Sequence, residues 1–179
     1  HLDNKMIKYI PTSLKSKIII KTKKEIDSLA KGVHQGIIID MEDYQYKSLS
    51  DILIKEISFV VILDHLEDPH NLGAIIRTAA SANVDAIILP QDRQVSVSST
   101  VVKASAGTIF NIDLVSVVNL KRTIDILKEE GFWIVGSALE GTDYRFIEYP
   151  LKTALVIGNE GKGISPIIKK SCDFLANIP

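Results

Sequence analysis

The side chains best suited to chemistry lie in residues 64–80, where an expected helix follows a short apolar, β-branched run typical of a buried strand. Asp68 can accept hydrogen bonds from the first free amides of that helix, and Pro69 suits its first position, where a missing N–H costs nothing. Leucine, isoleucine and alanine then recur at helical spacing and predict one apolar face. The stretch therefore predicts a capped amphipathic helix with polar side chains at its start.

Arg77 lies away from that apolar face. Counting back by whole turns places Gly73 and His70 on the same side of the helix as Arg77. This predicts a cationic side chain beside a notch in the helix surface, because Gly73 has no side chain. The alternative is an ordinary helix on which Asp64, Asp68 and Arg77 form a cap and a surface ion pair, because exposed charges on helices are usually solvated. Spacing alone favours the ordinary helix.

A second chemically suggestive segment is 155–165, where three glycines follow an apolar strand. Glycines there let the backbone turn sharply and approach a ligand closely, at the strand end where open α/β sheets bind small molecules. The segment is not a Walker loop, because Val156 stands where glycine is required and Lys162 is followed by Gly163 in place of Ser or Thr. It also lacks the spaced glycines of a dinucleotide fingerprint. A plain glycine-rich turn is the alternative.

The elements that must position these residues alternate between strands and helices from residue 57 onward. The expected strands are 57–63, 85–89, 109–118, 132–135, 153–157 and 174–178, and the expected helices are 69–82, 100–106, 120–130 and 166–172. This alternation predicts an α/β fold with a mostly parallel sheet covered by helices on both faces.

The beginning of the chain predicts less structure. Residues 1–46 contain two expected strands, at 18–20 and 36–41, and one short helix near 24–30, which is too little to close a core. We therefore divide the chain into a partial small α/β domain at 1–46, a linker to about residue 56, and a main domain at 57–179.

The composition is that of a soluble globular protein, with 46% hydrophobic and 24% charged residues. No apolar run is long enough to span a bilayer, and the first residues lack the apolar core of a signal peptide. The single cysteine, Cys172, permits no intrachain disulfide, so a cytoplasmic protein is the simplest inference. Cys172 is predicted to be a buried small residue. No metal is predicted, because His34 and His65 share no ligand spacing with each other or with Cys172.

The net charge of −1 argues against wholesale electrostatic binding of nucleic acid. The charges are unevenly distributed, however, because seven lysines precede Glu25 while Asp3 is the only acid there: Lys5, Lys8, Lys15, Lys17, Lys21, Lys23 and Lys24. Such a basic arm can hold a phosphate backbone, and a solvated lysine-rich surface is an equal alternative. The residues expected to contact a nucleic-acid backbone are Lys15, Lys17, Lys21, Lys23, Lys24 and His70.

Residues 68–79, Asp-Pro-His-Asn-Leu-Gly-Ala-Ile-Ile-Arg-Thr-Ala, resemble the first signature of the SpoU (TrmH-like) branch of the SPOUT methyltransferases. These enzymes transfer a methyl group from S-adenosylmethionine to a ribose 2′-hydroxyl of tRNA or rRNA. Residues 158–165 resemble the second signature. Residues 119–123 and 131–136 look like the subgroup that methylates a guanosine of large-subunit rRNA, and residues 34–36 are similar to the end of that subgroup's RNA-binding domain of ribosomal-protein type.

The resemblance implies that Arg77 is the catalytic arginine and that Asn71 and Glu160 are its accompanying polar residues. An arginine side chain is a poor general base, so Arg77 would need an RNA phosphate or a carboxylate to relieve its charge, or would orient the hydroxyl and stabilise developing negative charge. Glu160 would act as an orienting hydrogen-bond partner. The residues implied to hold S-adenosylmethionine are Gly136, Ser137, Ala138, Leu139, Gly158, Asn159, Gly161, Gly163 and Ile178.

The predicted function is therefore 2′-O-methylation of a guanosine in large-subunit rRNA, by a homodimer with active sites near the subunit interface. One alternative is a tRNA 2′-O-methyltransferase, and another is a non-catalytic RNA-binding or ribosome-assembly protein of the same fold. An unrelated doubly wound nucleotide-binding domain is disfavoured, because both phosphate-loop patterns are absent.

The family's third signature starts with Ile-Pro and completes the cofactor loop and a C-terminal helix, and the sequence ends at Ile178-Pro179. We therefore expect a chain cut short at both ends, with a methyltransferase domain that lacks its last motif. The resemblance implies that the remaining part threads through a loop and forms a trefoil knot, which general topology rules would not predict.

Overall fold

The computed structural model describes residues 8–30, 32 and 34–179, so Lys5 of the expected basic arm lies outside the described residues. The chain divides into two compact units, His1–Asp43 and Tyr44–Pro179, and each is described by itself. This division falls near the boundary predicted at residue 46. The roles predicted for the two parts stay predictions.

The first unit contains two short helices, α2 (Thr12–Lys15) and α3 (Lys23–Leu29). α3 begins at a capping box, in which the N–H of Thr22 donates to the Glu25 carboxylate at 2.7 Å and the N–H of Glu25 donates to the Thr22 hydroxyl at 3.3 Å. Two of the free amides at the helix start thus have partners. The helix expected near residues 24–30 is confirmed.

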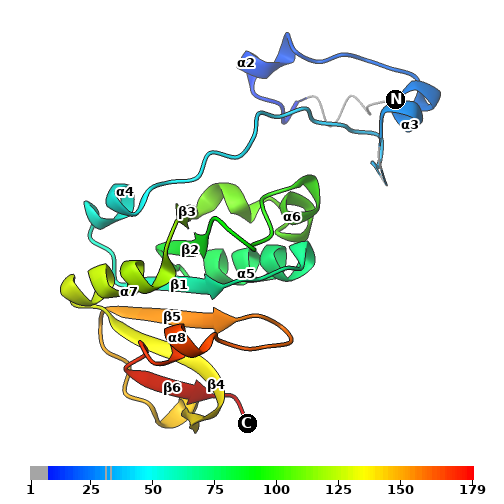
Figure 1. Ribbon diagram of the computed structural model, residues 1–179. Helices are drawn as coiled ribbons and strands as arrows, with labels where there is room; N and C mark the ends of the chain where they lie inside the picture. The colour runs from blue at the N-terminus through cyan, green and yellow to red at the C-terminus, as the bar shows by residue number, and fades with distance from the viewer. Residues whose placement is uncertain (1–7, 31, 33) are drawn as a thin grey trace. The chain divides into compact units, whose positions relative to one another are not determined.

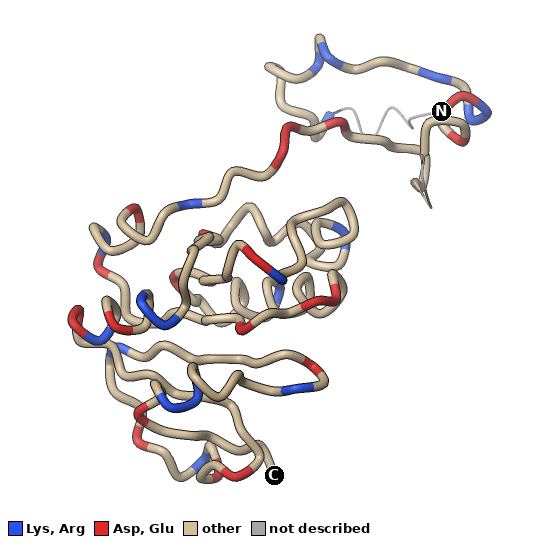
Figure 2. The backbone as a smooth tube through the Cα atoms, in the orientation of Figure 1, with Lys and Arg blue, Asp and Glu red and all other residues tan. Residues whose placement is uncertain are grey.

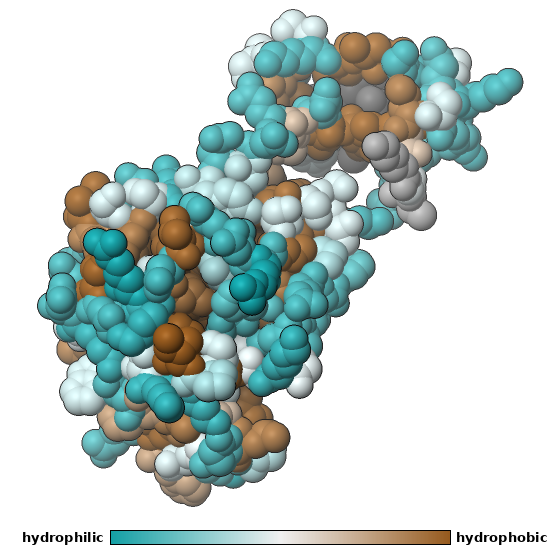
Figure 3. All heavy atoms as spheres, in the orientation of Figure 1, coloured by the Kyte–Doolittle hydropathy of each residue, from teal (hydrophilic) through white to brown (hydrophobic). Residues whose placement is uncertain are grey.

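The two strands expected in the first unit are wrong, because neither 18–20 nor 36–41 pairs with another strand among the described residues. A strand forms only where a neighbour takes its backbone hydrogen bonds. Large apolar side chains of this unit are exposed: Leu14, Ile19, Ile20, Leu29, Ile37, Ile38, Ile39 and Met41. Figure 3 shows hydrophobic residues in brown at the surface of this unit. An apolar β-branched run therefore predicts a strand correctly only when a partner lies beside it.

Six parallel strands form the sheet of the second unit, in the order β3-β2-β1-β5-β4-β6 (Figure 1). Their bounds are Phe59–Asp64 (β1), Ala86–Pro90 (β2), Asp113–Val117 (β3), Trp133–Asp143 (β4), Thr153–Gly158 (β5) and Phe174–Asn177 (β6). Because every pair is parallel, the carboxyl ends of all six strands lie at one edge of the sheet.

Helices cover both faces of this sheet. On the face that carries Val61 and Ile87 lie α5 (Pro69–Ser81), α6 (Ser99–Ala104) and the 3₁₀ helix η1 (Thr108–Asn111). On the face that carries Val60 and Ile88 lie α4 (Leu49–Leu53), α7 (Leu120–Glu129) and α8 (Pro166–Lys169). A further 3₁₀ helix, η2 (Tyr144–Phe146), follows β4. The predicted α/β fold is confirmed, whereas the threaded knot and the missing last motif stay predictions.

Two strands, β3 and β4, differ from their predicted bounds by more than two residues at one end. The strand expected at 109–118 begins only at Asp113, because Gly107 adopts a left-handed φ of 80° and the chain first makes the turn of η1. β4 is longer than predicted, because β6 pairs along it through an irregularity where both Ser137 and Thr142 lie opposite Ala176. Both differences depend on contacts that lie outside the strand itself.

The helix expected at 166–172 is also shorter than predicted, since α8 ends at Lys169. Beyond it the chain turns more tightly, and the N–H of Ser171 donates to the carbonyl of Ile168, three residues back, at 2.9 Å. Hydrogen bonds of this type are characteristic of the last turn of a helix. The chain then enters the edge strand β6.

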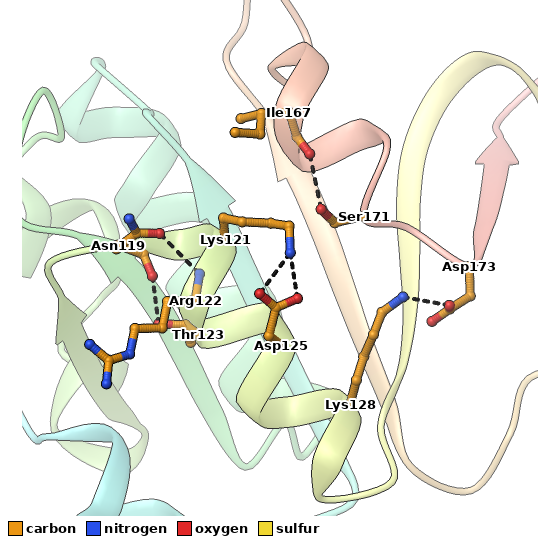
Figure 4. Close-up of polar contacts among 9 residues, drawn as sticks. All are labelled: Asn119, Lys121, Arg122, Thr123, Asp125, Lys128, Ile167, Ser171 and Asp173. Atoms are coloured by element: carbon orange, nitrogen blue, oxygen red, sulfur yellow. Dashed lines mark hydrogen bonds and ion pairs between the residues drawn. The ribbon is translucent and has the colours of Figure 1, made fainter.

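α7 forms where its sequence signals predict it. The side chain of Asn119 accepts a hydrogen bond from the N–H of Arg122 at 2.9 Å, and Gly131 follows the helix with a left-handed φ of 86°. Figure 4 shows Lys128 reaching from α7 to Asp173, directly before β6, at 2.6 Å. The helix is thereby attached to the edge strand of the sheet.

Candidate functional site

α5 begins immediately beyond the carboxyl end of β1. Asp68 caps it by accepting a hydrogen bond from the N–H of His70 at 2.9 Å, and Pro69 occupies the first helical position. The side chains and backbone that α5 buries lie on one face: Leu72, Gly73, Ile76 and Ala79. The predicted cap and apolar face are confirmed, and His70 is exposed at the helix start.

Gly73 does not form an open notch beside Arg77. A Cβ added at Gly73 would lie 2.4 Å from the Cβ of Ala104 and 3.0 Å from backbone atoms of Val101 and Ser105. α6 thus packs directly against α5 at this position, and glycine permits the close approach. The predicted notch is wrong, because a neighbouring helix, invisible to the spacing of α5 alone, fills that space.

The glycine-rich segment after β5 folds back on itself. The backbones of Asn159 and Gly163 exchange two hydrogen bonds, of 3.0 and 2.8 Å, and Gly163 has a left-handed φ of 66°. A Cβ added at Gly158 would lie 2.1 Å from the carbonyl carbon of Gly163 and 2.2 Å from the nitrogen of Ile164. Glycine at this position therefore permits a close approach of the loop's own backbone, and the approach of a ligand to Gly158 stays a prediction.

The side chain of Asn159 holds this loop to the end of β1. Its Oδ1 accepts hydrogen bonds from the N–H groups of Gly161 at 3.0 Å and Lys162 at 3.2 Å. Its Nδ2 donates to the carbonyl of His65 at 3.0 Å. Asn159, which the resemblance assigns to cofactor binding, thus has a structural role in joining two loops at the same edge of the sheet.

Asp64, the last residue of β1, is 1% exposed, so it does not form the surface ion pair with Arg77 that the ordinary-helix alternative allows. Its Oδ2 accepts a hydrogen bond from the N–H of Ser165 at 2.6 Å, and its Oδ1 lies 2.6 Å from Nδ1 of His65. The two oxygens therefore tie the end of the glycine loop to the loop before α5. Sequence reasoning missed this role, although a carboxylate directly after a buried strand was a usable signal.

The segments of the first and second signatures meet at Asn71 and Glu160. The side-chain amide of Asn71 donates to Oε1 of Glu160 at 3.0 Å, across 89 residues of sequence. This hydrogen bond is the main reason why the pKa of Glu160 lies below its ordinary value, and backbone amides of Glu160, Asp68 and Glu67 lower it further. Glu160 is therefore an ionised acceptor at neutral pH, held at the start of α5.

Arg77 does not join this pair. It lies six residues beyond Asn71 on α5, which corresponds to a rise of about 9 Å and a different side of the helix. Its side chain is exposed and makes no hydrogen bond or ion pair with any residue that the structure describes. The structure thus brings together two of the three residues assigned to catalysis and leaves the guanidinium available to another molecule.

The segments assigned to the cofactor end at the same edge on three neighbouring strands. Gly136 lies opposite Val156 of β5 and Leu175 of β6, and Ser137 lies opposite Ala176. A Cβ at Gly136 would lie 2.7 Å from the sulfur of Cys172, so this glycine, too, is required by packing. The next residue, Ala138, is half-buried.

Apolar side chains are exposed at this edge. Leu139 is 89% exposed and Ile178 is 77% exposed, and a Cβ at Gly161 would meet nothing closer than 3.7 Å. Exposed apolar groups beside strand-end backbone are suited to an adenine ring, which needs an apolar surface and backbone hydrogen bonds. The residues present therefore fit S-adenosylmethionine.

The described lysines of the basic arm, from Lys8 onward, lie in the first unit, where Figure 2 marks Lys and Arg in blue. Four of those assigned to RNA are exposed: Lys15, Lys17, Lys23 and Lys24. Lys21 lies 3.7 Å from the carboxylate of Glu25, one turn further along, so its charge is partly balanced. Their role in RNA binding stays a prediction.

Cys172 is half-buried, and burial raises the pKa of its thiol to about 11, which disfavours the nucleophilic thiolate. Within residues 8–30, 32 and 34–179, no group of three or more His, Cys, Asp or Glu side chains is placed to hold a metal ion. No helix in the described part of the chain has the length and apolarity to cross a membrane.

Two loops are tied together at the carboxyl edge of a parallel sheet, which is the edge where open α/β sheets usually bind their ligands. The family model that matches the chain is the SpoU rRNA Methylase family, over residues 58–179. The chain belongs to this family. The resemblance of the two signatures is confirmed at family level, and the rRNA-guanosine subgroup stays a prediction.

Individual relatives agree with this assignment. A proposed TrmH family tRNA/rRNA methyltransferase of Staphylococcus epidermidis is 44% identical over 171 residues, which cover 91% of this chain and 69% of the relative. The AdoMet-bound rRNA methyltransferase from Sinorhizobium meliloti is 34% identical, with a TM-score of 0.68, over 75% of this chain and 52% of that structure. The SpoU methyltransferase AviRb from Streptomyces viridochromogenes, in complex with AdoMet, is 26% identical, with a TM-score of 0.69, over 75% and 56%. This chain spans about half the length of these two solved structures.

Proposed function

We propose that this chain is part of an S-adenosylmethionine-dependent RNA methyltransferase that modifies the ribose 2′-hydroxyl of a guanosine in large-subunit rRNA. The hydrogen bond between Asn71 and Glu160 carries the proposal, because it joins the two signature segments into one site. Family membership and the cofactor named for two related structures support it.

When bound, S-adenosylmethionine supplies the electrophilic methyl group. The residues that would hold it are Gly136, Ser137, Ala138, Leu139, Gly158, Asn159, Gly161, Gly163 and Ile178. Leu139 and Ile178 offer apolar surface to the cofactor. Asn159 holds the glycine loop in one conformation by accepting hydrogen bonds from two of its backbone N–H groups. Holding the reacting groups in line is a large part of what such a site contributes.

Asn71 holds the Glu160 carboxylate at the start of α5, where it can accept a hydrogen bond from the ribose hydroxyl and orient the oxygen. The guanidinium of Arg77 can stabilise the negative charge that develops on that oxygen. Because the side chain of Arg77 is exposed and makes no hydrogen bond or ion pair with the described residues, we assign its guanidinium to the RNA or to a second copy of the chain.

The remaining parts of the proposal concern partners. The exposed lysines of the first unit and His70 would hold RNA phosphates, and the functional protein would be a cytoplasmic homodimer without a metal. A tRNA substrate is the alternative within the same chemistry. A non-catalytic RNA-binding or ribosome-assembly protein is the alternative outside it.

The test is transfer of labelled methyl from S-adenosylmethionine to unmodified rRNA and tRNA, with mapping of the modified nucleotide. Arg77→Ala is expected to reduce transfer by more than about 100-fold while S-adenosylmethionine binding, measured by calorimetry, stays unchanged. Arg122→Ala is the matched control, because Arg122 is an exposed arginine of α7 on the opposite face of the sheet (Figure 4). Unchanged turnover of Arg77→Ala would contradict the role of Arg77. RNA binding without any transfer would favour the non-catalytic protein.

A further inference from the structure

A hollow of about 200 Å³ lies at the carboxyl ends of β2 and β3, on strands that contribute nothing to the site described above. Its lining combines an aromatic ring, amides, hydroxyls and apolar groups: Tyr46, Leu89, Pro90, Gln91, Gln94, Val95, Ser96 and Ser116. Carboxyl ends of parallel strands are the usual place for ligands in such sheets. The size and chemistry of this lining suit one small, flat, polar group.

Gln94 carries an unsatisfied donor. Its Oε1 accepts a hydrogen bond from the N–H of Leu66 at 2.8 Å, and because a backbone N–H can only donate, this bond settles which end of the amide is oxygen. Its Nε2 is buried and has no hydrogen-bond partner among the described residues. A buried amide N–H without a partner costs free energy, so it calls for an acceptor from outside the chain.

The aromatic wall of the hollow is fixed in place. The hydroxyl of Tyr46 accepts a hydrogen bond from the N–H of Val97 at 2.9 Å. Its ring also packs edge-to-face against Tyr44, with 5.2 Å between the ring centroids. A ring held at both ends is a ready platform for a planar ligand, because little conformational freedom is lost on binding.

The hollow is connected to the candidate site by the segment before α5. Leu66 donates its N–H to Gln94, and its carbonyl accepts a hydrogen bond from the N–H of Val95 at 2.8 Å. Leu66 lies in the same loop as Asp68, which caps α5. The loop that leads into α5 is therefore hydrogen-bonded to two residues that line the hollow.

Exposed cations stand beside two of the lining residues. Lys47 follows Tyr46, and Arg93 precedes Gln94. A nucleotide needs both features, a pocket for the base and positive charge for the phosphate. A small neutral metabolite would need the pocket alone.

We propose that this hollow binds an unpaired nucleobase of the RNA substrate, next to the nucleotide that is modified. The base stacks on Tyr46, and a carbonyl oxygen or ring nitrogen of the base accepts a hydrogen bond from Nε2 of Gln94, while Lys47 and Arg93 hold the flanking phosphates. Proteins that read RNA sequence bind splayed bases of single-stranded loops by this combination of stacking and edge contacts. The inference rests on the proposed function, since it takes the ligand to be the RNA substrate.

Gln94→Glu tests the unsatisfied donor, because it keeps an oxygen for the N–H of Leu66 and removes the NH₂ group. Asn83→Asp is the matched control, since it adds the same charge at an exposed turn whose left-handed φ of 56° aspartate tolerates. The probes are fluorescein-labelled nine-nucleotide single-stranded RNAs of one base each, and their binding is followed by anisotropy. We expect Gln94→Glu and Tyr46→Leu each to weaken binding of at least one RNA by about fivefold or more, and Asn83→Asp to change it less than about twofold.

A second measurement needs no variant. Titration of the unaltered protein with the four nucleoside monophosphates should shift the side-chain NH₂ signals of Gln94 in an NMR spectrum, for the base that binds best. Signals that stay in place for all four, together with unchanged RNA affinity of folded Gln94→Glu and Tyr46→Leu, would show that the hollow holds water only and would overturn the proposal.

The outcome is separable from that of the proposed function. RNA binding that depends on Gln94 and Tyr46, without any methyl transfer, would keep the base site and refute the methyltransferase. Methyl transfer at an unchanged nucleotide and rate in both variants would refute the base site and keep the enzyme.

Discussion

Gly158→Ala tests how the glycine loop is built. The added methyl group would lie 2.1 Å from the carbonyl carbon of Gly163 and 2.2 Å from the nitrogen of Ile164. Both are backbone atoms, so no side-chain rotation can make room. The loop must open for the methyl group to fit.

Opening the loop breaks the two backbone hydrogen bonds between Asn159 and Gly163. At about 0.5–1.5 kcal/mol for each bond, their loss alone lowers the free energy of unfolding by about 1–3 kcal/mol. The same movement displaces the side chain of Asn159 from the loop amides that it caps. We therefore expect S-adenosylmethionine affinity to fall by about tenfold or more as well.

Gly161→Ala is the matched control in the same loop. Its added Cβ would meet nothing closer than 3.7 Å, an ordinary van der Waals distance, so its stability should stay within about 0.5 kcal/mol of the unaltered protein. Urea denaturation measures the first quantity, and calorimetric titration with S-adenosylmethionine measures the second. Equal stability of the two variants would refute the reasoning, because the loop would then accept a side chain at its closed end.

Two further predictions concern α5. Gly73→Ala should lower the thermal unfolding midpoint although alanine favours helices, because its Cβ would lie 2.4 Å from that of Ala104. Combining Gly73→Ala with Ala104→Gly should recover much of this loss of stability. A combined variant no more stable than Gly73→Ala would contradict the packing argument. Asn71→Ala should raise the pKa of Glu160 toward its ordinary value in a carboxyl NMR titration, while Asn119→Ala, which removes a cap from α7, should leave that pKa unchanged. Because the pKa of Glu160 is lowered in the folded protein, the stability that Glu160 contributes is present above its unfolded pKa and is lost as the pH falls through its folded pKa. The stability difference between Asn71→Ala and the unaltered protein should therefore shrink in acid. A stability difference independent of pH would refute this link.

Short-range signals in the sequence determined much of this structure. Asp68 and Asn119 marked the starts of α5 and α7, because a capping side chain acts on amides two or three residues away. The spacing of apolar residues likewise predicted the buried face of α5, and the alternation of elements predicted the parallel sheet. Each of these features is encoded within a few turns of chain or by the order of the elements.

Tertiary structure decided the rest. The space beside Gly73 is filled by α6, the space beside Gly158 is filled by the loop itself, and the β-branched run at 18–20 forms no strand. In each case the local structure depends on which atoms from distant parts of the chain come within a few ångströms. A pattern in the local sequence does not contain this information.

The candidate site shows both levels. The two signatures indicated its residues from the sequence, but the contact between Asn71 and Glu160 exists only because β1 and β5 lie side by side in the sheet. The same arrangement left Arg77 on another part of α5 and buried Asp64 between the loops. The residue types thus indicated which chemistry is possible, while the pairing of the strands determined which of those residues contact each other.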